Sequence, residues 1–259
     1  MQRGFVLAPL VLLACSSFGS EPTGSEADAG GSPPVGADAS IPDGAVAEVA
    51  DGSVECTRRR FSDGFLRNDL VGGGWDAFPY DAGDSLKLEL DSAFHTGDGK
   101  SLKIYAAPRA QGESTYFTKV SDVGRCPIRL TFSLRVEEAP KNEEYVTLAT
   151  IVLTSDTATF LTLKGSGFFV MEQRQGGAAG ASTKSRPLPS PATHAWTKID
   201  FRYDPTAQPP AIDVTVGSEP TVHYDTVLET GAPQKVHVGA AWASYGVAST
   251  LSIDDVSIE

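Results

Sequence analysis

The chain has 259 residues and a net charge of −12 at pH 7, from 33 acidic and 21 basic side chains. This acidic balance, without a basic stripe, excludes the electrostatic footprint of a nucleic-acid-binding protein, so we expect no nucleic acid among its partners. The one basic cluster, Arg58-Arg59-Arg60, is interpreted as a solvated stretch at a domain edge.

The first fifteen residues have the pattern of an export signal. Arg3 precedes an apolar run at 5–13, which is too short to span a bilayer because a spanning helix needs about 20 residues. The run ends in Leu12-Leu13-Ala14-Cys15, which resembles the end of a bacterial lipoprotein signal peptide. The resemblance implies cleavage of residues 1–14 and a lipid anchor on Cys15. The alternative is an ordinary signal peptide cut after Gly19, with Cys15 discarded.

Residues 15–55 predict a tether. They are mostly Gly, Ser, Ala and Pro with eight acidic side chains, and Phe18 is their one aromatic residue. Such a segment cannot bury enough apolar surface to offset its ordering entropy, so we expect it to be disordered. With a lipidated Cys15, the tether would hold a folded domain clear of a cell-envelope membrane, on the extracytoplasmic side. Ser16 is similar to the signal that directs lipoproteins to the outer membrane.

Two cysteines remain after the anchor, Cys56 and Cys126. Export to an oxidising compartment favours a disulfide bond between them, which would close a loop of about 70 residues and stabilise the domain by a few kcal/mol. Two free thiols or a metal pair are the alternatives. The four histidines are scattered and give no zinc spacing.

Residues 56–259 are long enough for one large domain, and two-residue alternation recurs along them. Alternating apolar and polar residues at 128–137 predict an antiparallel strand with one buried and one wet face. Similar alternation occurs at 86–91, 198–204, 212–216 and 236–242, whereas 146–153, 160–163 and 168–171 are apolar on both faces and predict central strands. No segment shows a helical period with caps. The predicted fold class is all-β, a two-sheet antiparallel jelly-roll sandwich preceded by the disordered tether.

The last predicted strand contains a change of phase. Leu251 and Ile253 share one phase, and Val256 and Ile258 share the other. A strand that keeps its apolar face buried must absorb this change at Asp254-Asp255, so we expect a β-bulge there.

Short motifs at both ends of this domain resemble those of bacterial extracellular jelly rolls. They are Phe61-Ser62-Asp63-Gly64-Phe65, Gly74-Trp75-Asp76 and 98–103 near the start, and 196–201 and 253–258 near the end. The domain looks like the concanavalin A-like lectin/glucanase group, which includes laminin-G-like domains. Carbohydrate-binding modules of galactose-binding-like fold are the alternative. The resemblance implies that the first and last strands pair side by side, and it permits polysaccharide binding.

Catalytic patterns are missing from the sequence. The Glu-x-Asp-x-x-Glu strand of glucanases of this fold does not occur, and the glutamates around 137–144 predict a charged hairpin loop. His223-Tyr224 and Arg202-Tyr203 have the residue types of jelly-roll polysaccharide lyases, but nothing else favours them. We therefore assign no catalytic residues.

Five aromatic residues are considered for a sugar platform, namely Trp75, Tyr80, Tyr105, Trp242 and Tyr245, and all but Trp242 are kept as candidates. Tyr105 is out of phase with Leu102 and Ile104, so it should point away from the core. Trp242 shares the phase of Val236 and Val238, and we expect it, like Trp196, to be a core residue.

Asp63 and either Asp254 or Asp255 would converge if the terminal strands pair, which makes a structural calcium ion a candidate cofactor. The alternative is that these carboxylates satisfy turn and bulge amides.

Taken together, the sequence predicts a lipid-anchored, non-catalytic module that binds a polysaccharide or a surface protein. A polysaccharide lyase or glycoside hydrolase with an unrecognised site, and a structural or adhesion protein of the envelope, are the alternatives.

Overall fold

The computed structural model describes residues 60–79, 85–97, 99–108, 113–121, 126–154, 157–174, 182–226, 232–244 and 246–259. Residues 1–14, Cys15, the tether at 15–55 and Cys56 lie outside this part of the chain, so the signal, the anchor, the tether and the disulfide bond stay predictions. Every regular element of the described part is a β-strand. No helix long and apolar enough to cross a membrane occurs among the described residues.

The first of two sheets, here called sheet A, has the strand order β12-β11-β10-β5-β14-β3-β2, and β1 pairs with β14 beside this path. Its strands are β1 (Phe61–Asp63), β2 (Leu86–Asp91), β3 (Ser101–Ala106), β5 (Ile128–Glu138), β10 (Trp196–Asp204), β11 (Ala211–Val216), β12 (Val222–Asp225) and β14 (Ser249–Ile258).

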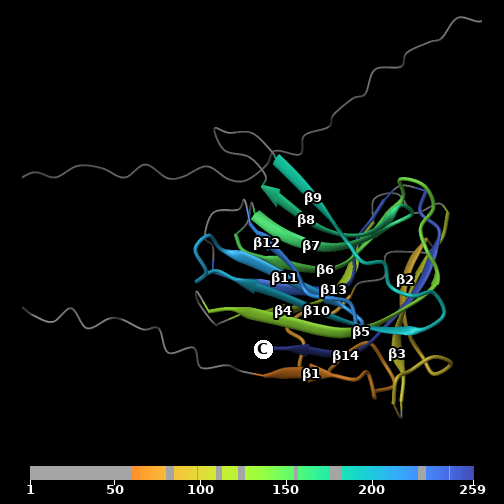
Figure 1. Ribbon diagram of the computed structural model, residues 1–259. Helices are drawn as coiled ribbons and strands as arrows, with labels where there is room; N and C mark the ends of the chain where they lie inside the picture. The colour runs from red at the N-terminus through yellow and green to blue at the C-terminus, as the bar shows by residue number, and fades with distance from the viewer. Residues whose placement is uncertain are drawn as a thin grey trace, which may run out of the picture. The chain divides into compact units, whose positions relative to one another are not determined.

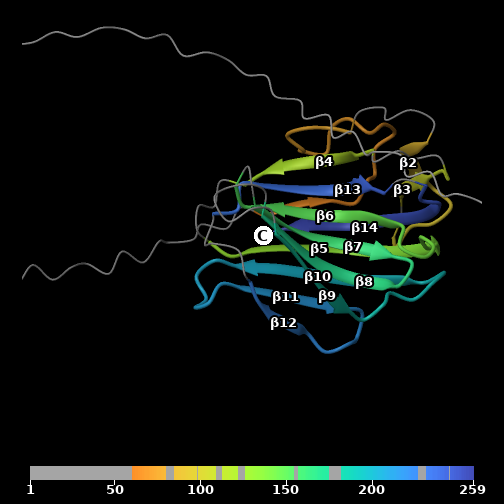
Figure 2. The same cartoon turned by 90° about the horizontal axis from the view of Figure 1, so that it is seen from above.

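The second sheet, sheet B, has the order β4-β13-β6-β7-β8-β9. Its strands are β4 (Thr115–Val120), β6 (Tyr145–Val152), β7 (Thr157–Lys164), β8 (Gly167–Arg174), β9 (Ser182–Leu188) and β13 (Lys235–Ala243). Figure 1 and Figure 2 show sheet B stacked on sheet A, and every strand pairing in both sheets is antiparallel. The predicted all-β sandwich is confirmed.

The alternation of apolar and polar residues explains why these segments form strands with one buried face. In β5, Ile128, Leu130 and Phe132 lie in the core while the residues between them reach the outer face of sheet A. In β6 six consecutive residues are buried, as predicted for a strand in the middle of a sheet. The apolar side chains of both sheets meet in one core between the layers.

The β-bulge predicted in the last strand is present. Asp254 pairs with Ser133 and Ser257 pairs with Thr131, so β14 carries one extra residue at this point. Asp255 takes a left-handed conformation, φ 50°, which aspartate tolerates better than most residues. The predicted pairing of the terminal strands is also confirmed, because Phe61 of β1 lies opposite Ile258 of β14.

Candidate functional site

The outer face of sheet B carries side chains in rows that cross the strands. The strand registers place six residues in one row and five in the next. The first row is Thr118, His237, Thr150, Phe160, Met171 and Ser185, and the second is Trp242, Thr147, Thr162, Phe169 and Pro187. Hydroxyl-bearing, aromatic and aliphatic side chains are therefore mixed on this face of the sheet.

A groove of about 400 Å³ lies on this face and extends from β4 to β8. None of the described residues that line it carries a full charge at pH 7. They are Ser114, Tyr116, Thr150, Val152, Thr154, Thr157, Ala158, Phe160, Gln173, His237, Ala241 and Trp242. The groove can therefore offer flat apolar surfaces and neutral hydrogen-bonding groups to a ligand.

Trp242 is the most exposed aromatic residue of the groove, with 45% of its surface accessible. The prediction that it lies in the core is wrong, because a β-bulge between Val238 and Trp242 shifts the phase of β13. Gly239 lies in this bulge with φ 131°, a conformation that favours glycine. The bulge turns Trp242 outward, opposite Thr147 of β6.

Beside it, Tyr116 of β4 and His237 of β13 form a stacked pair with ring centroids 4.3 Å apart and planes 18° from parallel. Burial, together with the positive charge of Lys235, lowers the pKa of His237 to about 4. At neutral pH the stack is therefore uncharged, and one edge of it borders the groove.

Two kinds of hydroxyl group lie among these rings. The hydroxyls of Thr147 and Thr162 are hydrogen-bonded to each other at 3.1 Å. Thr150 is 3% exposed and lines the groove, and its hydroxyl has no hydrogen-bond partner among the described residues. This oxygen is buried in the free protein, so a ligand could bond to it only if the side chains that cover it moved.

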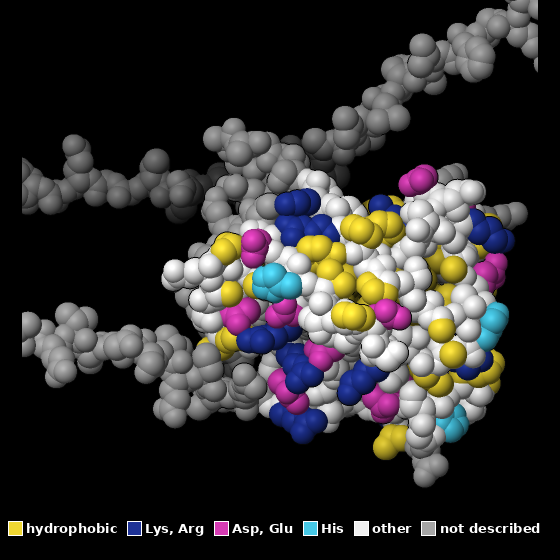
Figure 3. Space-filling model, viewed as in Figure 1, with side chains coloured by type: hydrophobic (Ala, Val, Ile, Leu, Met, Phe, Trp, Pro, Cys, Tyr) yellow, Lys and Arg dark blue, Asp and Glu magenta, His cyan; other side chains and the backbone are white. Residues whose placement is uncertain are grey.

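The outer face of sheet A differs in chemistry. Arg129 donates to Asp200 at 2.9 Å, and Arg202 donates to Asp204 at 2.7 Å. Figure 3 shows basic and acidic side chains interleaved on the visible face of the molecule. This surface is a solvated network of ion pairs, which are individually weak.

The predicted sugar platform is not assembled. Tyr105 on β3 is exposed, as its phase predicts, but it belongs to sheet A. Trp75 is only 5% exposed and packs against Phe61 and Phe117, so its prediction as a surface platform is wrong. Tyr80 and Tyr245 lie outside the described residues.

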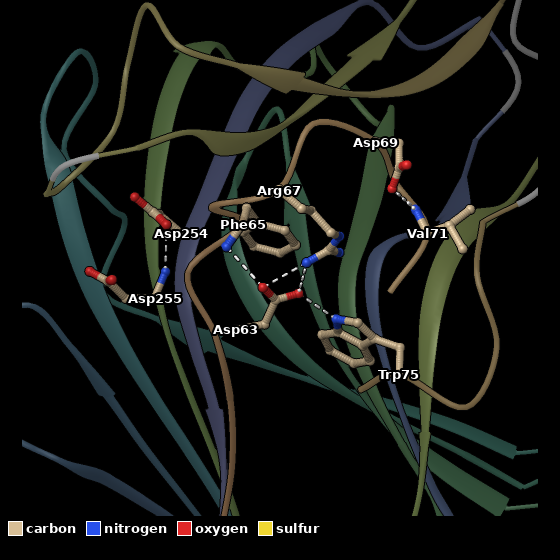
Figure 4. Close-up of polar contacts among 8 residues, drawn as sticks. All are labelled: Asp63, Phe65, Arg67, Asp69, Val71, Trp75, Asp254 and Asp255. Carbon is tan, nitrogen blue, oxygen red and sulfur yellow. Dashed lines mark hydrogen bonds and ion pairs between the residues drawn. The ribbon is translucent and has the colours of Figure 1, made fainter. Parts of the chain in front are cut away.

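The carboxylate of Asp63 accepts hydrogen bonds from several groups of the protein itself. Its carboxylate accepts hydrogen bonds from the Phe65 amide at 2.9 Å, from Arg67 Nη1 at 2.6 and 2.7 Å and from Trp75 Nε1 at 2.6 Å. Figure 4 shows it turned toward Arg67 and Trp75 rather than toward Asp254 and Asp255. The burial of Trp75 follows from this contact.

Asp254 accepts hydrogen bonds from the amides of Thr96 at 2.9 Å and Asp255 at 2.8 Å. Burial raises its pKa, and the hydrogen bonds oppose that rise. Among the described residues no group of three or more His, Cys, Asp or Glu could hold a metal ion. These carboxylates do not fit a calcium cage, and their geometry matches the alternative, in which they satisfy turn and bulge amides.

The lyase-type residue pairs do not form a site in the structure. Tyr203 is fully buried in the core, and Tyr224 donates its hydroxyl to the carbonyl of Pro187. His223 is hydrogen-bonded to Asp213 at 2.7 Å, which raises the pKa of His223. Glu137 at the end of β5 is paired with Arg135 and His194.

The structure also describes Trp196, which we expected in the core, and Cys126, which we expected in a disulfide bond. Trp196 is half-buried and out of phase with Thr197 and Ile199, so it faces away from the core, against our expectation. Cys126 is buried directly before β5. Its predicted partner, Cys56, lies outside the described residues.

No protein-family model and no curated protein sequence matches the chain. Among solved structures, the cellulose-induced protein Cip1 is similar with a TM-score of 0.55 at 15% identity, over 77% of this chain and 96% of that one. The family 7 alginate lyase A1-II′ has a TM-score of 0.43 at 10% identity, over 65% of this chain and 84% of that one. The alginate lyase AlyA1 of Zobellia galactanivorans has a TM-score of 0.41 at 10% identity, over 65% and 81%. The similarity to the cellulose-induced protein confirms the jelly-roll sandwich and shows the fold alone.

Proposed function

We propose that this protein is a non-catalytic glycan-binding module and that its ligand lies in the groove on sheet B. The observation that carries this proposal is the exposed Trp242 in one groove with the stacked Tyr116 and His237 and with several threonines. Sugar rings have apolar faces and hydroxyl edges, and such a surface offers both an aromatic platform and hydrogen-bonding groups.

Binding fits the groove better than catalysis. Gln173 lies on β8, three strands away from His237 on β13, and three strand spacings amount to about 14 Å. These two side chains are therefore too far apart to act on one bond. The described lining holds neither an arginine nor a pair of carboxylates, so it supplies no charge-neutralising cation for a lyase and no acid and nucleophile pair for a glycoside hydrolase.

The cellulose-induced protein supports the proposal only through its fold, because a jelly roll can carry such a groove on one of its sheets. We also propose that Cys15 is lipidated and that residues 15–55 display the module outside the cytoplasm, at the outer membrane. This second part rests on the resemblance of Leu12-Leu13-Ala14-Cys15 to a lipoprotein signal.

The test is affinity electrophoresis in gels that contain neutral or acidic polysaccharides, followed by isothermal titration with oligosaccharides of any that retard the protein. Trp242→Ala should weaken binding at least tenfold, because it removes the exposed ring of the platform, and a tenfold loss corresponds to about 1.4 kcal/mol. Tyr105→Ala is the matched control, since Tyr105 is 40% exposed on the other sheet.

Tyr105→Ala should bind like the unmodified protein. The proposal fails if the gels retard no variant, or if the two substitutions weaken binding equally.

A further inference from the structure

Thr150 lines the groove, and its hydroxyl oxygen is buried beneath the groove surface. Thr150 is 3% exposed, and its oxygen has no hydrogen-bond partner among the residues that the structure describes. Burying a hydroxyl without a partner costs free energy, and a valine of similar shape would avoid this cost. The hydroxyl would gain a partner on binding if the ligand displaced the side chains that cover it.

The residues around Thr150 indicate which group of a ligand could hydrogen-bond to it. Its two register partners in the row are His237 on β13 and Phe160 on β7, so Thr150 lies between two residues that carry rings. A sugar that rests on these rings with its apolar face would bring an edge hydroxyl close to Thr150. The groove crosses β4, β13, β6, β7 and β8, a width of about 19 Å, which accommodates a short oligosaccharide.

The lack of charged side chains in the described lining of the groove favours a neutral ligand. No described lining residue is fully charged at pH 7, and His237 stays neutral there because its pKa is about 4. A uronate chain would have to place carboxylates in this groove without a cationic partner from the described lining, which is unfavourable. A neutral chain has no such cost.

Given the proposed function, on which this step rests, we infer that the groove takes a neutral, hydroxyl-rich glycan and that Thr150 determines specificity by hydrogen bonding to one of its hydroxyl groups. The ligand class is thus a neutral hexose or pentose polymer.

The first experiment separates binding from packing at Thr150. Thr150→Val should raise Tm by a few degrees, because the unpartnered hydroxyl is removed, and should weaken binding of neutral oligosaccharides about five- to twentyfold. Thr159→Val is the matched control. Thr159 is also a fully buried threonine without a partner for its hydroxyl among the described residues, but it pairs with Ile151 on the inner face of the same sheet.

Thr159→Val should raise Tm in the same way and leave affinity unchanged. If Thr150→Val binds as tightly as the unmodified protein, the role of Thr150 is overturned. If both variants lose affinity equally, the effect is one of packing, and the role of Thr150 is again overturned.

The second experiment measures the ligand class by isothermal titration with cellohexaose, xylohexaose and mannohexaose against hexamers of mannuronate and guluronate. At least one neutral oligosaccharide should bind ten times more tightly than every uronate. If uronates bind equally well or better, this inference fails while the proposed function stands. If no oligosaccharide of either class binds, the proposed function itself fails.

Discussion

The protonation of His237, which lines the groove, affects the stability of the folded protein. His237 is half-buried against Tyr116, and its pKa lies near 4 instead of the usual 6.5. The folded protein therefore binds fewer protons at this position than the unfolded chain does at pH values between about 4 and 6.5. Folding stability from this residue is present above pH 6.5 and is lost as the pH falls through this window.

We expect the free energy of unfolding to fall by up to about 3 kcal/mol between pH 7 and pH 4 through His237 alone. His237→Gln should remove that part of the pH dependence, because glutamine does not titrate. Urea unfolding at several pH values measures the slope for both proteins. Equal slopes for the two proteins would contradict the burial of a neutral His237.

At the scale of the element, the bulge in β13 positions Trp242. A Cβ atom on Gly239 would approach the Leu88 side chain, the Thr115 carbonyl oxygen and the Tyr116 Cα atom to 3.1 Å each. The positive φ adds strain for any other residue. The bulge therefore depends on a glycine at this position.

Gly239→Ala should lower the free energy of unfolding by about 2 kcal/mol, as expected for one strained backbone position. It should also change the fluorescence of Trp242, because the strand must shift to relieve the contacts. Gly64→Ala is the control, since a Cβ atom there would meet nothing within 4 Å. Chemical denaturation of both variants compares them, and equal stabilities would argue against the strained bulge.

Sequence patterns predict the β-bulge at Asp254-Asp255 in β14 and miss the one in β13. In β14 large apolar residues flank the bulge on both sides, so their change of phase is visible at Asp254-Asp255. In β13 the bulge falls on Gly239-Ala240-Ala241, where small side chains carry no phase signal, and Trp242 is misplaced as a result.

Sequence periodicity also fails to predict contacts that cross loops. Strand alternation predicts β5 and β10 well because burial repeats every second residue. The burial of Trp75 depends on its contact with Asp63, twelve residues earlier across an irregular loop, and no local period encodes such a contact. Tyr116 and His237 could have been found by treating 115–120 as a strand, since Tyr116 is out of phase with Phe117.

At the scale of the whole molecule, Arg186 connects the edges of the two sheets. It lies on β9 of sheet B, donates to the Asp225 carbonyl on β12 of sheet A and covers the Tyr224 ring at 4.8 Å. Its guanidinium is also 3.4 Å from the carboxylate of Glu172, whose side chain is 1% exposed. Arg186 therefore compensates a buried charge while it holds the edges together.

Arg186→Met should lower the free energy of unfolding by about 3 kcal/mol, because it removes the Arg186 cation from beside the buried Glu172 carboxylate. Arg202→Met, at an exposed pair on sheet A, should cost less than about 1 kcal/mol. Thermal and urea unfolding give both values. The double variant Glu172→Met and Arg186→Met should recover most of the loss, and failure to recover would show that the charge pair is not the cause.

The pairing of β1 with β14 has a consequence for the path of the chain. Arg60 and Glu259 lie at the same end of this antiparallel pair, and their side chains form an ion pair at 3.2 Å. The first and last residues that the structure describes are therefore neighbours. A short peptide could join these ends and a new opening could be made at the 217–221 turn, so a circularly permuted chain could keep the same layers, core and groove.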